Sequence, residues 1–258
     1  RSPSSSTGPS PVPGSSITNL VIQHGNGISG GIPHAGPLTL IANTVTDNSS
    51  TGSGAGISNS GSLTLSASNV SRNVAVGNGG GISNSGTLTL TDDTISDNTS
   101  SGMGGGIYNS ATLVLFDSTV SGNGAGIAAG GGGIDSASPG TVTLANVVLS
   151  GNSGNSASDD FDGVPYTTSS GSIVGVVNGA MVNATAINLA PLGSYGGPTQ
   201  TMIPLPGSPA ICNGLAAGIP TGLTTDQRGL PNINAGYPGY AACVDSGAVQ
   251  TSYALSFT

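Results

Sequence analysis

Apolar residues return at a fixed interval through the middle of the chain. An isoleucine that follows paired small residues recurs every 25 residues, with one interval of 27, and two other apolar patterns keep the same step. Self-similarity at a fixed period is the signature of a solenoid. The patterns are Ile32, Ile57, Ile82, Ile107 and Ile134; the pairs Leu38/Leu40, Leu63/Leu65, Leu88/Leu90, Leu113/Leu115 and Val142/Leu144; and Val45, Val70, Ile95, Val120 and Leu149.

The local alternation of residues indicates which kind of solenoid this is. In Leu-Thr-Leu the two leucines face one side and the threonine faces the other, as in a β-strand. A unit of this length has no room for two amphipathic helices of about 10–15 residues each. The sequence therefore predicts an all-β fold, a right-handed parallel β-helix with three short strands per coil, whose coils stack about 4.8 Å apart.

Asparagines recur in step with the apolar columns. One follows each member of the third apolar pattern, which begins at Val45, by three residues. Stacked amides of this kind form hydrogen bonds with their neighbours above and below. A second column contains Asn59, Asn84 and Asn109, and His34 falls at its start. The main predicted ladder is Asn48, Asn73, Asn98, Asn123 and Asn152.

Composition divides the chain into three regions. Residues 1–16 are rich in Pro, Ser and Gly and are expected to form an arm that packs on its own domain or on a neighbouring copy. Residues 17–190 are expected to form the β-helix, and residues 191–258 a loop-rich C-terminal cap. Because the chain starts at Arg1 and not at Met, we interpret it as a processed product or a segment of something longer.

Charge excludes several partner classes. The net charge is −8, and the three cationic residues are all arginine. Nucleic-acid binding needs clustered Lys and Arg to neutralise phosphates, so we expect no nucleic-acid partner. The apolar stretches are too short for a membrane span.

Cys212 and Cys243 are the only cysteines, a pair suited to one disulfide. With the Ser/Thr/Gly-rich composition they favour a secreted or cell-surface protein.

Four short motifs follow one another in the C-terminal third. Together with the repeat unit at 79–90, they resemble bacterial surface β-helix proteins that carry a choice-of-anchor Q domain. The repeats are also similar to those of chlamydial polymorphic outer-membrane proteins, and the resemblance covers nearly the whole chain after residue 17. It implies a right-handed parallel β-helix, export, and no defined catalytic activity. The motifs are Gly196-Gly197-Pro198-Thr199-Gln200-Thr201, Pro206-Gly207-Ser208-Pro209-Ala210-Ile211, Thr225-Asp226-Gln227-Arg228-Gly229 and Asp245-Ser246-Gly247-Ala248.

The chain departs from the family at two places. Cys212 stands where the family usually has Asp, and Val249-Gln250 replaces an aromatic residue followed by Glu. The resemblance implies that the motifs beside Cys212 and Cys243 lie close together, which favours a disulfide between these two residues.

An acidic group on neighbouring coils is the sharpest candidate for chemistry. Asp92 and Asp117 are predicted to stack, with Asp93 beside them. Such carboxylates could bind Ca²⁺ or serve a glycoside hydrolase. A lyase would need Lys or Arg nearby, and a hydrolase would need an acid with a raised pKa, which exposed aspartates would not have. We therefore favour a solvated acidic face and expect no catalytic residue and no cofactor.

Other charged residues have simpler interpretations. Asp47, Arg72 and Asp97 share a column and predict a salt-bridge stack worth about 0–1 kcal/mol per pair. His24 has no Cys or acidic partner at metal-ligand spacing, so no metal site is expected there.

The pattern favours a structural function over an enzymatic one. We expect an extracellular subunit of a surface filament, or an adhesin-like stalk, whose partners are other copies that join head to tail or exchange arms. The alternative is a protein that binds or cleaves a surface polysaccharide along the coils.

Overall fold

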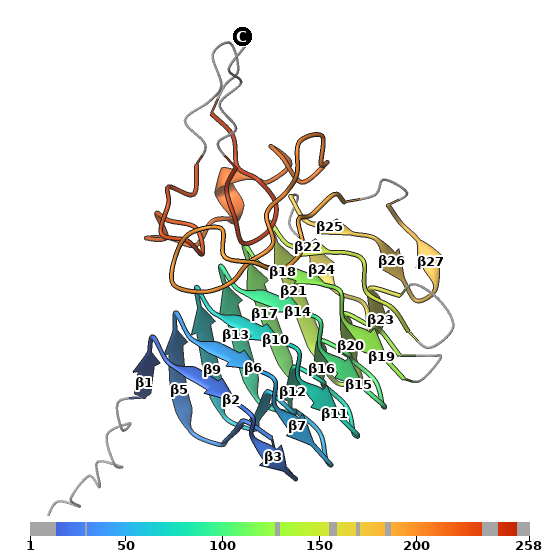
Figure 1. Ribbon diagram of the computed structural model, residues 1–258. Coiled ribbons are helices and arrows are strands. Elements are labelled where there is room, and N and C mark those ends of the chain that lie inside the picture. Colours follow the sequence, from blue (N-terminus) through green and yellow to red (C-terminus); the bar gives the residue numbers. More distant parts are fainter. Residues whose placement is uncertain are drawn as a thin grey trace, which may run out of the picture.

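The computed structural model describes residues 14–28, 30–126, 130–154, 159–168, 171–183, 187–233 and 242–251. Within these residues the chain is an all-β solenoid with one short 3-10 helix, η1 (Ala216–Gly218), and the coils stack along one axis (Figure 1). The predicted all-β solenoid is confirmed. The first strand, β1, begins at Ser15, so the expected boundary at residue 17 falls inside it. The rest of the expected arm, residues 1–13, lies outside the described residues.

Each regular coil contributes strands to four parallel sheets, one more than predicted. The additional strand is only two residues long, so it leaves almost no alternation to detect in the sequence. Sheet A contains β1 (Ser15–Thr18), β5 (Pro37–Ile41), β9 (Ser62–Ser66), β13 (Thr87–Thr91), β17 (Thr112–Phe116), β21 (Thr141–Ala145) and β24 (Thr167–Thr168). Sheet B contains β2 (Val21–Gln23), β6 (Thr44–Thr46), β10 (Asn69–Ser71), β14 (Thr94–Ser96), β18 (Thr119–Ser121), β22 (Val148–Leu149) and β25 (Ile173–Val174).

The two remaining sheets complete the coil. Among the strand pairs of these four sheets in the described residues, only the last pair of sheet D, β26 with β27, is antiparallel. Sheet C contains β3 (Asn26–Gly27), β7 (Ser49–Ser50), β11 (Val74–Ala75), β15 (Thr99–Ser100) and β19 (Gly124–Ala125). Sheet D contains β4 (Ile32–His34), β8 (Ile57–Asn59), β12 (Ile82–Asn84), β16 (Ile107–Asn109), β20 (Ile134–Ser136), β23 (Phe161–Gly163), β26 (Val176–Val177) and β27 (Ala180–Met181).

The predicted columns form the core. Ile82 pairs in register with Ile57 and Ile107, and the register continues across the 27-residue interval to Ile134. The three apolar columns line one continuous buried cluster, which Phe161 extends at the end of the isoleucine column. No coil can bury its apolar face alone, so this stacking is what stabilises the fold.

Two corners of each regular coil hold a residue with positive φ. Between sheets A and B these are Ala42, Ala67, Asp92, Asp117 and Asn146, with φ between 43° and 54°. Asp and Asn tolerate this left-handed conformation better than most residues other than glycine, which explains their presence at a tight corner. The corner places Asp92 and Asp117 at the same position on adjacent coils.

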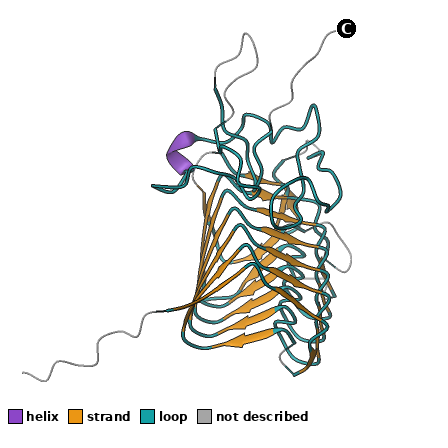
Figure 2. Cartoon of the chain, turned by 60° about the vertical axis from the view of Figure 1, so that its left-hand side comes forward, coloured by secondary structure: helices purple, strands orange, loops and turns teal. Residues whose placement is uncertain are grey.

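The C-terminal segment, defined here as residues 187–233 and 242–251, folds back along the solenoid (Figure 2). It contacts successive coils from Ala67 to Gly171 and covers the outward face of sheet B over β10, β14 and β18. All three residues of β10, β14 and β18 are therefore buried, whereas the strands of sheet A keep exposed outward residues. The expected cap follows the last coil in the sequence. In space it also covers one side of the solenoid.

Candidate functional site

The structure confirms that Asp92 and Asp117 stack on adjacent coils. Thr91 pairs with Phe116 immediately before them, and Thr94 pairs with Thr119 just after them. The expected solvated acidic face is nevertheless wrong. Asp92, Asp93 and Asp117 are 3%, 0% and 2% exposed, because the C-terminal segment lies over this corner and the adjoining face of sheet B.

Asp93 is a structural residue of the corner. Its Oδ1 accepts a hydrogen bond from the backbone N–H of Ser68 at 2.7 Å, and its Oδ2 accepts one from the N–H of Thr91 at 2.8 Å. Ser68 and Ser118 occupy the equivalent position on the neighbouring coils. The hydroxyl of each accepts a hydrogen bond from a backbone N–H of the preceding coil. Burial raises the pKa of Asp93 well above its usual range, and the two backbone donors oppose that rise.

Asp92 and Asp117 are less well compensated. Asp117 Oδ1 accepts a hydrogen bond from Asn146 at 3.0 Å, whereas its buried Oδ2 has no partner in the described part of the chain. The Asp92 carboxylate accepts no hydrogen bond from the described residues. Burial, followed by the charge of Asp117, raises the pKa of Asp92 to about 9, and burial raises the pKa of Asp117 to about 7. Two neighbouring carboxyl groups therefore resist ionisation near neutral pH.

These aspartates do not form the three-carboxylate calcium site that the sequence allowed. In the part of the chain that the structure describes, three potential ligand atoms lie within 4.8 Å of one another only at Cys212, Cys243 and Asp245. Those two cysteines are bonded to each other, so they offer no thiolate to a metal. Both oxygens of Asp93 accept backbone hydrogen bonds, which removes it from the candidate set.

Gln227 attaches the C-terminal segment to the solenoid. Its amide oxygen accepts a hydrogen bond from the Thr94 hydroxyl at 2.6 Å, and its amide nitrogen donates to the carbonyl of Ser68 at 3.1 Å. The same nitrogen contacts the Thr199 hydroxyl, which in turn donates to the carbonyl of Ala67. The sequence singled out both motifs that contain these residues but did not indicate that they meet over sheet B.

Other buried contacts hold the remainder of the segment. The N–H of Ala248 donates to the Thr119 hydroxyl, and Asn146 bonds both backbone groups of Leu215. Arg228 forms a buried ion pair with Asp226 at 2.7 Å. The segment is thus fixed to at least three consecutive coils by polar contacts, and it covers the acidic corner.

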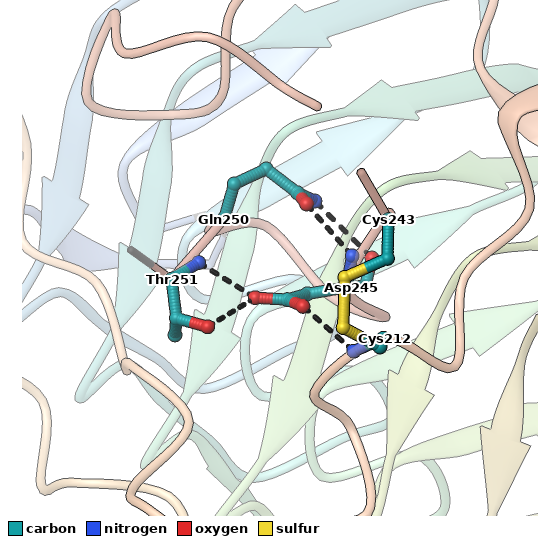
Figure 3. Close-up of a disulfide and its surroundings, with 5 residues drawn as sticks. All are labelled: Cys212, Cys243, Asp245, Gln250 and Thr251. Atoms are coloured by element: carbon teal, nitrogen blue, oxygen red, sulfur yellow. Dashed lines mark hydrogen bonds between the residues drawn. A yellow bond between two sulfur atoms is a disulfide. The ribbon is translucent and has the colours of Figure 1, made fainter. Parts of the chain in front are cut away.

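The predicted disulfide between Cys212 and Cys243 is formed, with 5.1 Å between the Cα atoms (Figure 3). Beside it the buried Asp245 accepts a hydrogen bond at Oδ1 from the N–H of Cys212 and two at Oδ2 from Thr251. Gln250 bonds the backbone N–H and carbonyl of Asp245. The motif that contains Asp245 therefore organises the disulfide loop.

The predicted asparagine ladder is confirmed. At each step from Asn48 to Asn152, the side-chain oxygen accepts both the backbone and the side-chain N–H of the preceding asparagine at 2.9–3.0 Å. The ladder ends at Asp160, which the sequence did not identify. Its Oδ1 accepts hydrogen bonds from the backbone N–H and the side-chain amide of Asn152. At the other end Gly25 has no side chain to continue it. The second ladder runs from Asn59 through Asn84 to Asn109, with His34 in register at its start.

The predicted salt-bridge stack is only half formed. Arg72 bonds Asp47 at 3.1 Å on an exposed surface, whereas no hydrogen bond joins it to Asp97 within the described chain. The Arg72 guanidinium, as the strongest influence, lowers the pKa of Asp47.

The first coil leaves strand edges without a partner among the described residues. Strands β1, β2, β3 and β4 each pair only with the next coil. Leu20, Val21 and Ile28 are exposed there, and Ile17 and Ile22 are only partly buried over the core. At the far end β24 and β25 each pair only with the preceding coil, and Met181 and Val182 are exposed.

Comparison with protein-family models, curated proteins and solved structures finds no match to this chain. The resemblance to choice-of-anchor Q proteins therefore stays a prediction. No helix in the described residues is long and apolar enough to cross a membrane.

Proposed function

We propose that this protein is an extracellular structural module whose copies join head to tail through the open ends of sheets A and B. The observation that carries the proposal is the set of strand edges at the first coil that have no partner among the described residues, together with exposed aliphatic side chains. An unprotected strand edge is a template for pairing with another chain. A contact between two different ends of a subunit does not close on itself and produces a filament.

Backbone hydrogen bonds show which groups at the first coil are free to pair. In a parallel ladder, alternate residues bond to opposite neighbours. The carbonyl of Leu20 and the N–H of His24 bond to the second coil, so the N–H and carbonyl of Val21 face the open edge. On β1 the N–H of Asn19 bonds to the second coil, which leaves Thr18 facing outward.

The ends of sheet D are less suited to parallel pairing than those of sheets A and B. At the first coil, Ile32 and His34 bond to the next coil, so Pro33 occupies the outward position and has no N–H to offer. At the other end the antiparallel pair β26–β27 terminates the sheet. Sheets A and B are therefore the surfaces that a second copy would extend, and head-to-tail order would preserve their parallel strands.

Burial disfavours the polysaccharide alternative at the acidic corner. A glycosidase needs two carboxyl groups that reach the glycosidic bond. Here Asp92 and Asp117 lie beneath the C-terminal segment, and the adjoining face of sheet B is covered as well. The disulfide is compatible with an oxidising, extracellular compartment and supports that part of the proposal.

Electron microscopy and sedimentation of the purified chain test the proposal. Wild-type protein is expected to form filaments or concentration-dependent oligomers. Val21→Pro, which removes an outward N–H as Pro33 does naturally, should yield monomers, and Val21→Lys should weaken assembly. Val76→Lys is the matched control, because Val76 is 62% exposed and Val21 57%, but Val76 lies in the middle of the solenoid.

Monomers of the wild-type protein at all concentrations would overturn the proposal. Assembly that Val76→Lys and Val21→Lys reduce equally would contradict the assignment to the first coil. Cleavage of a polysaccharide that disappears in Asp92→Asn and Asp117→Asn would establish the alternative.

A further inference from the structure

The buried pair Asp92 and Asp117 has no structural need for negative charge. The other members of the same corner column are Ala42, Ala67 and Asn146, all neutral and all in the same left-handed conformation. Asn146 shows that an amide fits the corner and finds partners there. Two carboxylates on adjacent coils are costly to bury unless something compensates them.

No cationic side chain of the described residues compensates this pair. Arg228 is bound to Asp226 and to the carbonyl of Gln250, and Arg72 lies at a different corner against Asp47. The sequence contains no lysine. The charges near Asp92 are all negative: Asp117 and Asp93 on the solenoid, and Asp226 on the C-terminal segment that covers it.

A second observation points to a ligand at the same place. Asp117 directs Oδ1 to the Asn146 amide on the next coil, and its Oδ2 is buried without a hydrogen-bond partner among the residues that the structure describes. Buried polar atoms in folded proteins are rarely left unsatisfied, and each exception calls for a water, an ion or a ligand. The neighbouring Asp93, in contrast, has both oxygens satisfied by backbone N–H groups.

We propose that Asp92 and Asp117 bind one Ca²⁺ ion between two adjacent coils, beneath the C-terminal segment. Calcium takes oxygen ligands in flexible geometry, with carboxylates that bind through one or both oxygens and with carbonyls and waters that complete the shell. Magnesium demands a stricter octahedral arrangement and binds more weakly to such a pair. Asp93 is not a ligand.

The ion neutralises the two carboxylates and so stabilises the docked C-terminal segment. Extracellular calcium modules bind with a Kd of about 10⁻⁴–10⁻³ M, and two carboxylates fit that weak class. The site is independent of the proposed assembly through the first coil, because Asp92 and Asp117 lie on interior coils.

Calorimetric titration of metal-stripped protein with CaCl₂ at pH 7.5 tests the proposal directly. One site is expected for the wild type and none for Asp92→Asn/Asp117→Asn. In about 10 mM CaCl₂ the Tm of the wild type should rise by about 5 °C relative to EDTA, and the double variant should not respond. MgCl₂ should give a smaller rise.

Asp97→Asn is the matched control, because Asp97 lies on the same coil as Asp92 and also has positive φ, but at the next corner. It should keep the full calcium response. Equal Tm values in CaCl₂ and EDTA, with no binding heat, would overturn the proposal. The carboxyl groups of Asp92 and Asp117 would then be buried in their protonated form. Calcium binding that survives in the double variant would place the site elsewhere. If the double variant does not fold, the wild-type titration and Asp92→Asn alone decide the question.

Discussion

The Thr94 hydroxyl donates a 2.6 Å hydrogen bond to the Gln227 amide oxygen, although 133 residues separate them in the chain. Both side chains are buried, one on sheet B and the other on the C-terminal segment. Their contact joins a repeat unit to a segment that has no repeat. It is one of the contacts through which the segment buries a face of the solenoid that carries Thr, Ser and Asn.

Gln227→Ala should release the C-terminal segment locally. The substitution removes the buried donor to the Ser68 carbonyl and leaves the Thr94 hydroxyl with only the Thr201 hydroxyl as a partner, which costs about 1–3 kcal/mol. Limited proteolysis should cut residues 187–233 faster, and the Tm should fall. Gln200→Ala is the control, because only the backbone carbonyl of Gln200 takes part in this network. Equal proteolysis of the two variants would contradict the role of Gln227.

The buried acids predict a stability that decreases as the pH rises in metal-free protein. Their folded pKa values, about 9 for Asp92 and about 7 for Asp117, lie above the usual value of 3.8. The folded state therefore binds more protons than the unfolded state above pH 4, and this contribution is complete below pH 4 and is lost as the pH rises through 7 to 9. Unfolding in EDTA should show a slope on the order of 1 kcal/mol per pH unit for each group.

Replacement of the acids by their amides provides the check. Asp92→Asn/Asp117→Asn should reduce the dependence between pH 5 and 9, because these two groups no longer titrate, whereas Asp93, whose pKa burial also raises, keeps its contribution. Asp47→Asn should leave it unchanged, because the pKa of Asp47 is lowered and its titration ends below this range. A wild-type stability that is constant from pH 5 to 9 in EDTA would contradict the inferred burial.

The solenoid could be predicted because its sequence repeats. The position of the C-terminal segment, which does not repeat, could not. Each aliphatic column and each ladder asparagine is confirmed, because stacking repeats the same environment at every coil and so leaves a periodic trace. The position of the C-terminal segment (residues 187–233 and 242–251) leaves no such trace. Its contacts are single, long-range pairs such as Thr199 with Ala67, and the sequence alone therefore left Asp92 and Asp117 apparently solvated.

The same argument explains the smaller errors. The fourth strand of each coil has two residues, too short for alternation to identify. Asp160 closes the asparagine ladder only eight residues after Asn152, outside the regular step, so the period could not reveal it. The disulfide was indicated by the pair of cysteines and by motif resemblance, and its geometry depends on the fold of the C-terminal segment.

Interior ladder positions should be more sensitive to substitution than the ladder ends. Asn98→Ala removes the acceptor of both Asn73 donors and the donor to the Val70 carbonyl, which leaves several buried groups unpaired. We expect a loss of about 3–5 kcal/mol in the free energy of unfolding. Asn48→Ala should cost less, because its acceptor serves only the N–H of Gly25 at the partly exposed first coil. Urea unfolding of both variants measures the difference, and equal losses would contradict a continuous ladder.

Removal of the disulfide should loosen the C-terminal segment without unfolding the solenoid. The bond closes a loop with a sequence separation of 31, for which the chain-entropy estimate is on the order of 3 kcal/mol. Because the ladders and the apolar columns contain neither cysteine, Cys212→Ala/Cys243→Ala should keep the far-ultraviolet circular dichroism of the β-helix. Its first unfolding transition should move to lower temperature, and proteolysis near residues 212–233 should accelerate. Reduction of the wild type should reproduce both effects, whereas loss of the whole β spectrum on reduction would show that the segment and the solenoid fold as a single unit.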